Sequence, residues 1–470
     1  MKLLVFGTGD YYQRYKKWLV HQDVVALLDN SPIKQNTLLE GKEVLSPQNG
    51  ICREFDAVVI MSFYVKDMKA QMKSLGVAEE KIYHFFDLRK LINLEENRQD
   101  IQYYGISRQE IRNRAKASIA LLSTDLAFGG TALALFHMAK ALHRAGYPII
   151  FASTMDGPLR KRLEMCKIPV VVDPNLQLAT MRETDWLSEF RLIICNSINY
   201  YTLLIERDFK IPVIWWLHDS AFFYDGVDKG ALREIPWKNL TVLSVGPIPE
   251  KAIHEIVPEL PIGQLLYGVE DSVGKKDKSR KVDGEREYAG ERICFVTIGY
   301  IEERKGQDIL LQAVSILDKS IREKTIFYLV GQDTSLLAGK LKEQAETISE
   351  VVVTGPVGRE ELESILNRAD VMICPSREDP MPTVAAEAMM HSVPCIVSNV
   401  VGTAAYIQEE REGLIFESEN AFELSAKIKW CVENRDRLER MGRGARQIYE
   451  RKFSMDVFEK KLIKIVEEFV

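Results

Sequence analysis

The sequence predicts an α/β protein built from doubly wound domains with parallel sheets. Short apolar runs alternate with helical stretches, and glycine-containing loops separate them. In the last third of the chain the predicted strands are 293–298, 326–330, 351–354, 369–374 and 394–398. Repeated strand–loop–helix units with right-handed crossovers produce a parallel sheet with helices on both faces. A length of 470 residues predicts two or three such domains.

Composition and charge exclude several classes of protein. A net charge of −6 argues against a general nucleic-acid binder. The seven cysteines form no C-x-x-C pair, and most lie in apolar runs, which indicates free thiols in a reducing compartment. No stretch approaches the roughly 20 apolar residues of a membrane span. We therefore expect a cytoplasmic protein without a disulfide framework or a zinc site.

Residues 1–92 are predicted to form a small α/β domain of their own. A strand at 2–6 is followed by Gly7-Thr8-Gly9, and Asp29 ends the next predicted strand. This is most of a dinucleotide-binding fingerprint, in which a tight glycine turn leads into a helix and an acid holds a ribose. Tyr12 occupies the third glycine position. We expect an accessory domain that docks on the rest of the chain, and NAD binding stays open as an alternative.

A polar segment at 93–116 is predicted to be a partly helical linker, and a second α/β domain follows at 117–272. Gly129 and Gly130 precede a predicted helix, where glycines let a backbone approach a ligand closely. His218 follows a buried strand, at a sheet edge. The aromatic residues at 222–224 are expected either to form a wall for a sugar or simply to pack.

The third α/β domain is predicted at 291–470, after a charged loop at 273–290, and ends in helices from 421 onward. Its most informative stretch runs from Cys374 to Met390. A short buried strand leads into a turn with Asp379, and a helix is predicted at 383–390 with Pro382 at its first position. The turn aims acidic side chains and a helix N-terminus at the crevice where open α/β sheets bind ligands.

Four features of this domain together resemble retaining glycosyltransferases of the GT-B fold, family 4 in particular. In chain order they are Arg304-Lys305-Gly306, Gly331, the stretch 374–390, and Gly402 before Tyr406. The resemblance covers about residues 117–470. It implies two Rossmann-like doubly wound domains that face a cleft, preceded by the small Rossmann-like domain at 1–92.

The resemblance also implies roles for individual residues. Asp379 would orient the sugar or stabilise oxocarbenium character, and His218 would contact the substrate, so these two are the expected catalytic residues. Gly129 and Gly130 would lie on the acceptor side. The expected donor-binding residues are Arg304, Lys305, Glu378, Met381, Thr383, Val384, Glu387, Gly355 and Gly402. The chain departs from the family pattern with Asp379 in place of Glu and Tyr300 in place of Arg.

The activity implied is glycosyl transfer from a nucleotide sugar, a UDP-sugar ahead of a GDP-sugar, with retention at the anomeric carbon. The acceptor would be a carbohydrate, a lipid-linked molecule or a peptide. The chain contains no D-x-D sequence, so we expect no metal and no cofactor, with basic residues stabilising the leaving diphosphate. Bacterial polysaccharide or glycoconjugate biosynthesis is the expected setting. Peripheral association with the inner face of the membrane and the oligomeric state stay open.

Two other functions remain possible at this point. One is a catalytically inactive transferase homologue that acts as partner or chaperone of an active glycosyltransferase, which Asp379 and Tyr300 would favour. The other is an oxidoreductase, which rests only on Gly7, Gly9 and Asp29.

Overall fold

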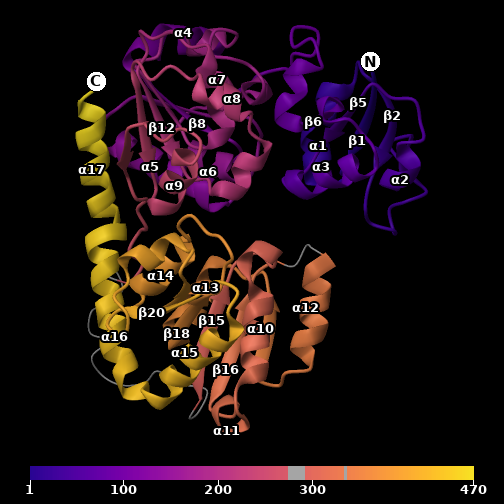
Figure 1. Ribbon diagram of the computed structural model, residues 1–470. Helices are drawn as coiled ribbons and strands as arrows, with labels where there is room; N and C mark the ends of the chain where they lie inside the picture. The colour runs from indigo at the N-terminus through magenta and orange to yellow at the C-terminus, as the bar shows by residue number, and fades with distance from the viewer. Residues whose placement is uncertain (274–291, 333–335) are drawn as a thin grey trace. The chain divides into compact units, whose positions relative to one another are not determined.

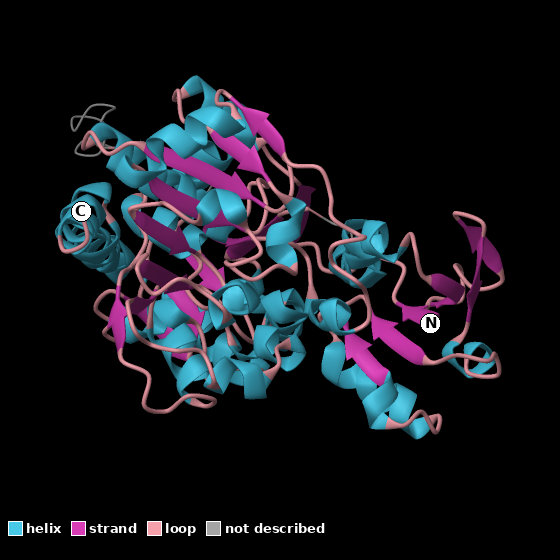
Figure 2. Cartoon of the chain, turned by 90° about the horizontal axis from the view of Figure 1, so that it is seen from above, coloured by secondary structure: helices cyan, strands magenta, loops and turns pink. Residues whose placement is uncertain are grey.

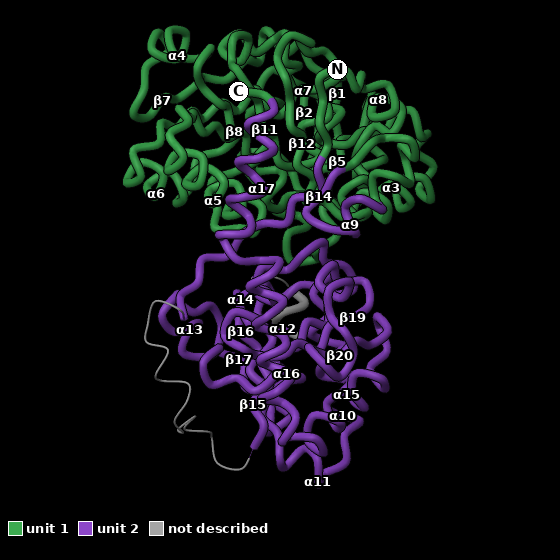
Figure 3. Tube along the Cα trace, turned by 90° about the vertical axis from the view of Figure 1, so that its left-hand side faces the viewer, with its two compact units in different colours: residues 1–242, 252–262, 469–470 green, residues 243–251, 263–468 purple. Residues whose placement is uncertain are grey.

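The computed structural model describes residues 1–273, 292–332 and 336–470. Apart from residue 273, the predicted charged loop at 273–290 lies outside this part of the chain. Contacts divide the chain into two compact units, coloured in Figure 3. Unit 1 is Met1–Val242, Ala252–Ile262 and Phe469–Val470, and unit 2 is Leu243–Lys251 and Gly263–Glu468. The predicted α/β fold class is confirmed, because three mainly parallel sheets follow one another along the chain.

The first sheet lies in residues 1–92, which we call the N-terminal module, and has the order β3-β4-β2-β1-β5-β6. Its strands are β1 (Lys2–Phe6), β2 (Asp23–Leu28), β3 (Thr37–Leu39), β4 (Lys42–Leu45), β5 (Ala57–Ile60) and β6 (Ile82–His84), and its helices are α1 (Asp10–Tyr15), α2 (Pro47–Gly50) and α3 (Val65–Ser74). Only the β3–β4 pair is antiparallel. Leu3 and Val5 enter one core and Leu4 and Phe6 another, as the two-residue period of a strand requires.

The second sheet also belongs largely to unit 1 and has the order β14-β13-β12-β11-β8-β9-β10-β7. Its strands are β7 (Gln102–Tyr104), β8 (Ile119–Ser123), β9 (Ile149–Ser153), β10 (Val170–Val172), β11 (Leu192–Cys195), β12 (Val213–Leu217), β13 (Leu240–Ser244) and β14 (Ile262–Gln264). The helices are α4 (Arg108–Arg114), α5 (Gly130–Arg144), α6 (Leu159–Met165), α7 (Tyr201–Ile205), α8 (Lys229–Arg233) and α9 (Pro247–His254). The expected linker at 93–116 does contain a helix, α4, but it also supplies β7, which pairs antiparallel with β10 at the sheet edge.

The third sheet lies in unit 2 and is parallel throughout, in the order β17-β16-β15-β18-β19-β20. Its strands are β15 (Ile293–Ile298), β16 (Thr325–Val330), β17 (Val351–Gly355), β18 (Val371–Cys374), β19 (Cys395–Ser398) and β20 (Gly413–Phe416). The helices are α10 (Gln307–Ile316), α11 (Lys319–Arg322), α12 (Leu336–Glu346), α13 (Arg359–Arg368), α14 (Thr383–Met390), α15 (Ala421–Glu433), α16 (Arg435–Ile448) and α17 (Met455–Glu467). Figure 2 shows helices (cyan) packed beside the strands (magenta), as expected for a doubly wound sheet.

Each sheet has a point where the strand order reverses. In the N-terminal module it lies between β1 and β5, in the second sheet between β8 and β11, and in the third between β15 and β18. The loops that leave two neighbouring strands diverge there, which opens a crevice at the carboxyl edge. These three reversal points are therefore the places to look for ligand sites.

The N-terminal module is packed against the second domain within unit 1 (Figure 1). One continuous core includes Trp18 and Phe85 of the module and Trp215 of β12. The Trp18 indole N–H donates to Gln177 at 3.4 Å, and Arg89 forms an ion pair with Glu183 at 2.9 Å, so polar contacts surround this shared core. The module therefore docks on the second domain through buried apolar surface.

None of the helices in the described ranges combines the length and the apolar character that crossing a bilayer requires.

Candidate functional site

The reversal point of the third sheet brings two sequence-predicted residues together. Lys305 follows β15 and Asp379 follows β18, and these strands are direct neighbours. The Lys305 ammonium lies 2.6 Å from Asp379 Oδ2, and the side chains are only 18% and 6% exposed. A half-buried cation and a buried carboxylate thus meet at the crevice where an open α/β sheet binds ligands.

Arg304 strengthens the positive charge at the same place. Its Nη1 donates to the Glu378 carbonyl at 3.0 Å and lies 4.0 Å from Asp379 Oδ2. Gly306 ends this short turn with φ +66°, and a Cβ there would lie 2.1 Å from the Pro375 carbonyl oxygen. Glycine is therefore required to hold the basic turn against the loop that leaves β18.

Helix α14 carries the second predicted acid. Glu387 is mostly buried and accepts a hydrogen bond from Arg359, the first residue of α13. The helix spans Thr383–Met390 as predicted, but Pro382 is its N-cap and not its first helical residue. The reason is that the Pro382 backbone is extended, with ψ 120°. By helix geometry the N–H groups of Thr383 and Val384 lie outside the intrahelical ladder and remain able to bind an anion.

The remaining donor-side residues shape the edge of this crevice. The Gly402 N–H donates to the Asp379 carbonyl at 3.0 Å, and a Cβ on Gly402 would lie 1.8 Å from the Pro380 carbonyl oxygen. Met381 is buried. Gly355 ends β17 with φ +72°. Gly355, at the end of β17, and Gly402, after β19, thus lie at the same edge of the sheet as Asp379, and their proposed contacts with a donor remain predictions.

The predicted acceptor-side residues lie in unit 1, at the carboxyl edge of the second sheet. Gly129 is the N-cap of α5 and Gly130 its first residue. His218 follows β12 and is buried, which lowers its pKa to about 3, so the imidazole is neutral at pH 7. Burial also raises the pKa of the neighbouring Asp219 to about 6, although its carboxylate accepts hydrogen bonds from Ile198 and Ser197.

The residues of the incomplete dinucleotide fingerprint make contacts with other residues of the N-terminal module. Asp29 accepts hydrogen bonds from the Thr8 N–H and hydroxyl and forms an ion pair with Lys34 at 3.2 Å. These contacts hold the pKa of the Asp29 carboxyl below its usual value despite burial. Tyr12 is buried in the core where a third glycine would stand. The acid that would bind a ribose therefore already has internal partners.

Two family models match the chain. Residues 278–448 match the model described as Glycosyl transferases group 1, and residues 1–83 match C2185-like, N-terminal. One similar relative is an uncharacterized 41.2 kDa protein in the cps region of Klebsiella pneumoniae, 28% identical over 34% of this chain and 42% of its own. Another is a GDP-mannose-dependent alpha-(1-6)-phosphatidylinositol monomannoside mannosyltransferase of Mycobacterium tuberculosis, 24% identical over 44% of this chain and 55% of its own. The chain thus spans about half the length of these relatives.

Among solved structures, Anabaena Alr3699/HepE in complex with UDP and glucose is similar with a TM-score of 0.61. The likeness covers 75% of this chain and 100% of the other at 17% identity, so it bears on the fold alone. The chain has the GT-B fold. The two Rossmann-like domains implied by the sequence resemblance are therefore confirmed as architecture.

Sequence reasoning missed Arg359, the cation that holds Glu387. One signal was present: the sequence predicts a helix from Arg359 to Asn367, and the helix dipole disfavours a positive charge at a helix N-terminus. The sequence could not show which carboxylate this arginine meets, because Arg359 and Glu387 belong to different helices.

Proposed function

We propose that this protein is a glycosyltransferase that moves a sugar from a nucleotide-sugar donor to an acceptor hydroxyl. The observation that carries the proposal is the Lys305–Asp379 pair at the reversal point of the third sheet, beside the N-terminus of α14. The match of residues 278–448 to the group 1 glycosyltransferase model supports it independently. A site that holds both cations and carboxylates suits a ligand that has both anionic and hydroxyl groups, which a nucleotide sugar has.

The chemistry follows from where the charges lie. The bond between the anomeric carbon and the diphosphate oxygen breaks, and its electron pair leaves with the diphosphate. The acceptor oxygen forms the new bond to that carbon, and its proton passes to the departing diphosphate. Lys305, Arg304 and the first N–H groups of α14 would stabilise the growing negative charge. This proposal needs no metal ion, and transfer is expected to continue in the presence of EDTA.

The carboxylates would position the sugar nucleotide. Asp379 would contact the transferred sugar once Lys305 turns to the diphosphate, and Glu387 would accept from the ribose hydroxyls while Arg359 holds it. His218 would contact the substrate as a neutral imidazole, since burial keeps its pKa far below 7. Retention at the anomeric carbon and membership of family 4 rest on the sequence resemblance.

The donor and setting are also part of the proposal. We expect a UDP-sugar, a cytoplasmic location and a role in bacterial polysaccharide or glycoconjugate biosynthesis. The similar structure that holds UDP supports the first of these, whereas the mycobacterial relative is GDP-mannose-dependent. The acceptor would be a carbohydrate, a lipid-linked molecule or a peptide.

A thermal-shift panel with UDP, GDP, ADP, TDP and NAD tests the proposal. A ligand at about 100 times its dissociation constant stabilises the folded state by roughly 2.7 kcal/mol, which is visible as a higher Tm. A shift with one nucleoside diphosphate, absent in Lys305→Ala, is the expected result and names the base. Failure of every nucleoside diphosphate to shift the Tm would contradict the donor site and favour an inactive homologue. A shift with NAD alone would move the function to the N-terminal module.

A further inference from the structure

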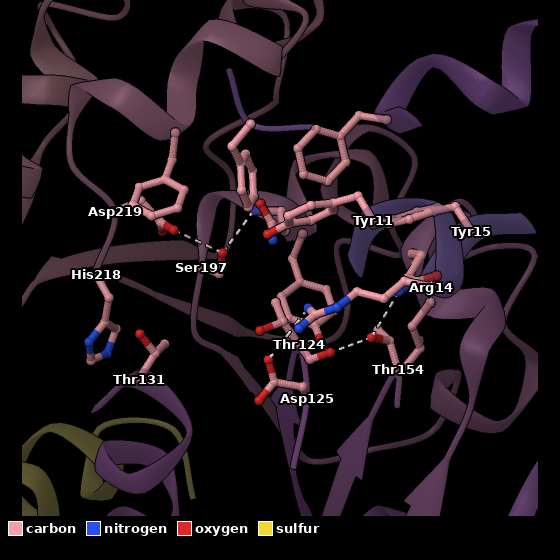
Figure 4. A pocket seen from close by; sticks show the side chains of 17 residues that line it. Tyr11, Arg14, Tyr15, Thr124, Asp125, Thr131, Thr154, Ser197, His218 and Asp219 are labelled. Carbon is pink, nitrogen blue, oxygen red and sulfur yellow. Dashed lines mark hydrogen bonds and ion pairs between the residues drawn. The ribbon is translucent and has the colours of Figure 1, made fainter. Parts of the chain in front are cut away.

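A pocket of about 190 Å³ lies inside unit 1, between the N-terminal module and the second domain (Figure 4). The reversal points of both sheets contribute to it. Tyr11 and Phe63 come from the segments after β1 and β5, whereas Asp125 and Ser197 come from the segments after β8 and β11. Two crevices of the kind that bind ligands in open α/β sheets therefore open into one space.

The pocket has the size of a single sugar ring. Its volume corresponds to about six water molecules at roughly 30 Å³ each. Pockets that enclose a drug-sized ligand measure about 300–1,000 Å³, so this pocket is smaller than a site that encloses a complete nucleotide sugar.

The second domain supplies the polar side of the pocket. In the part of the chain that the structure describes, His218 Nε2 and Asn199 Oδ1 are buried without a hydrogen-bond partner, and both residues line the pocket. His218 is only 8% exposed and lies on the same wall as Thr131, at the start of α5 (Figure 4). Unpartnered buried polar atoms are costly, and a ligand with several hydroxyls would supply their partners.

The N-terminal module supplies most of the aromatic side. Tyr11 stacks on Phe85 at 4.9 Å and meets Phe63 edge-on at 4.5 Å, and Phe63 in turn packs against Phe223 of the second domain at 5.0 Å. These contacts fix the rings before any ligand binds. An apolar wall opposite a few placed polar groups is the usual build of a small-molecule site, and it suits the C–H face of a sugar ring.

The charged side chains of the pocket do not favour an anionic ligand. Arg14 Nη1 lies 3.9 Å from Asp125 Oδ2, too far for a direct hydrogen bond and close enough for a hydroxyl to bridge both groups. Asp219 adds a second carboxylate, and His218 is neutral at pH 7. The pocket thus carries no excess positive charge that would favour an anionic sugar.

We propose that this pocket binds one uncharged monosaccharide unit of the acceptor and that the N-terminal module completes the site with its aromatic wall. The inference rests on the proposed transferase function, because a sugar bound here is expected to be the acceptor. It gives the module a role in acceptor recognition in place of the dinucleotide binding that its glycine turn resembles.

Saturation-transfer NMR on the full chain, without donor, tests the proposal. The probes are methyl α-D-glucopyranoside, methyl β-D-galactopyranoside, methyl α-D-mannopyranoside and N-acetylglucosamine, with glucuronate and NAD as competitors of other chemistry. Each probe is used at about 10 mM, a concentration that populates complexes with dissociation constants as weak as about 1 mM. Arg14→Met and Asp125→Asn test the two sides of the pocket. Arg53→Met is the matched control, because Arg53 belongs to the same module and pairs with Glu43 at the surface.

We expect saturation transfer to at least one neutral glycoside in the wild type and in Arg53→Met. Binding should weaken about tenfold or more in Arg14→Met and Asp125→Asn, the loss expected for one hydrogen bond to a charged group. The proposal is overturned if no glycoside binds, if Arg14→Met binds as the wild type does, or if glucuronate or NAD displaces the glycoside. Because the nucleotide panel reports on unit 2 residues, a Tm shift with a nucleoside diphosphate but no glycoside binding would remove this inference alone.

Discussion

At the scale of single residues, the candidate donor site consists of charges that already have partners. Lys305 holds Asp379 and Arg359 holds Glu387, in each case with a mostly buried carboxylate. A ligand that offers only phosphate would draw Lys305 away and leave the Asp379 carboxylate without a partner. A neutral sugar would give Lys305 no anionic group to bind. A nucleotide sugar offers both partners, because its diphosphate replaces the carboxylate at Lys305 and its hydroxyls replace the ammonium at Asp379.

Glu387→Ala should weaken donor binding and transfer while the fold persists. A hydrogen bond to a charged group contributes roughly 1.5–3 kcal/mol, so the expected loss is about 10- to 100-fold in kcat/KM for the donor. The measurement is steady-state transfer with the nucleotide sugar that the thermal-shift panel selects, alongside the Tm of each variant.

Glu363→Ala is the matched control, because Glu363 also pairs with Arg359, at 3.2 Å, from within α13. It removes the same kind of group from the same arginine, but Glu363 belongs to α13 and not to α14. Full activity in Glu387→Ala with a normal Tm, or equal losses in the two variants, would contradict the proposed contact between Glu387 and the ribose.

At the scale of elements, the sequence predicted best those strands and helices that are buried. The predicted strand at 293–298 and the helix at 383–390 match β15 and α14, since a buried parallel strand is a continuous apolar run and an alanine-rich segment is a strong helix former. The three-residue strand β7 was not predicted, because it lies at a sheet edge and is partly exposed, so its sequence lacks an apolar pattern.

The pairing of side chains in the site was harder to predict than the elements that carry them. Lys305 and Asp379 are 74 residues apart, and their contact depends on β15 and β18 being neighbours in the sheet. Sequence alone gives the order of strands along the chain but not their order in space. The glycines of the site were easier to predict, because a glycine in the loop after a strand indicates that another part of the backbone or a ligand comes close to it.

Gly306→Ala tests whether the turn after β15 holds the basic residues in place. The substitution puts a Cβ at φ +66° and 2.1 Å from the Pro375 carbonyl oxygen, so the turn must move away from the loop that leaves β18. A left-handed residue costs about 1–2 kcal/mol and overpacking about 1–3 kcal/mol, so we expect a loss of roughly 2 kcal/mol or more in stability. The nucleotide-induced Tm shift should shrink as well, because Lys305 is displaced.

The control for Gly306→Ala is Gly358→Ala. Gly358 precedes α13 with φ −73°, and a Cβ there meets nothing within 4 Å. This variant should keep both its nucleotide response and its stability to within about 1 kcal/mol, the cost of alanine at an N-cap. If Gly306→Ala also kept both, the turn would not be what positions Lys305.

At the scale of the whole molecule, the N-terminal module shares a hydrophobic core with the second domain of unit 1 and is not a separately packed domain. Trp18 and Phe85 are fully buried in the cluster that also contains Trp215 of the second sheet. His84 of the module packs closely against Gly226 of the second domain, because a Cβ on Gly226 would lie 2.4 Å from the His84 ring. A domain that shares its core in this way is expected to unfold together with its neighbour, and the pocket between the two sheets depends on that docking.

Phe85→Ala tests this cooperativity. Truncating a fully buried phenylalanine costs about 3–5 kcal/mol, and the loss should appear in every element that depends on the shared core. Hydrogen exchange should therefore show faster opening of both β1 in the module and β8 in the second domain. Phe416→Ala is the matched control, since Phe416 is equally buried but belongs to the core of the third sheet. This variant should accelerate hydrogen exchange in the third sheet and leave β1 and β8 unchanged. If Phe85→Ala accelerated exchange in β1 alone, the module would be an independent folding unit, and a site completed jointly by the module and the second domain would lose its structural basis.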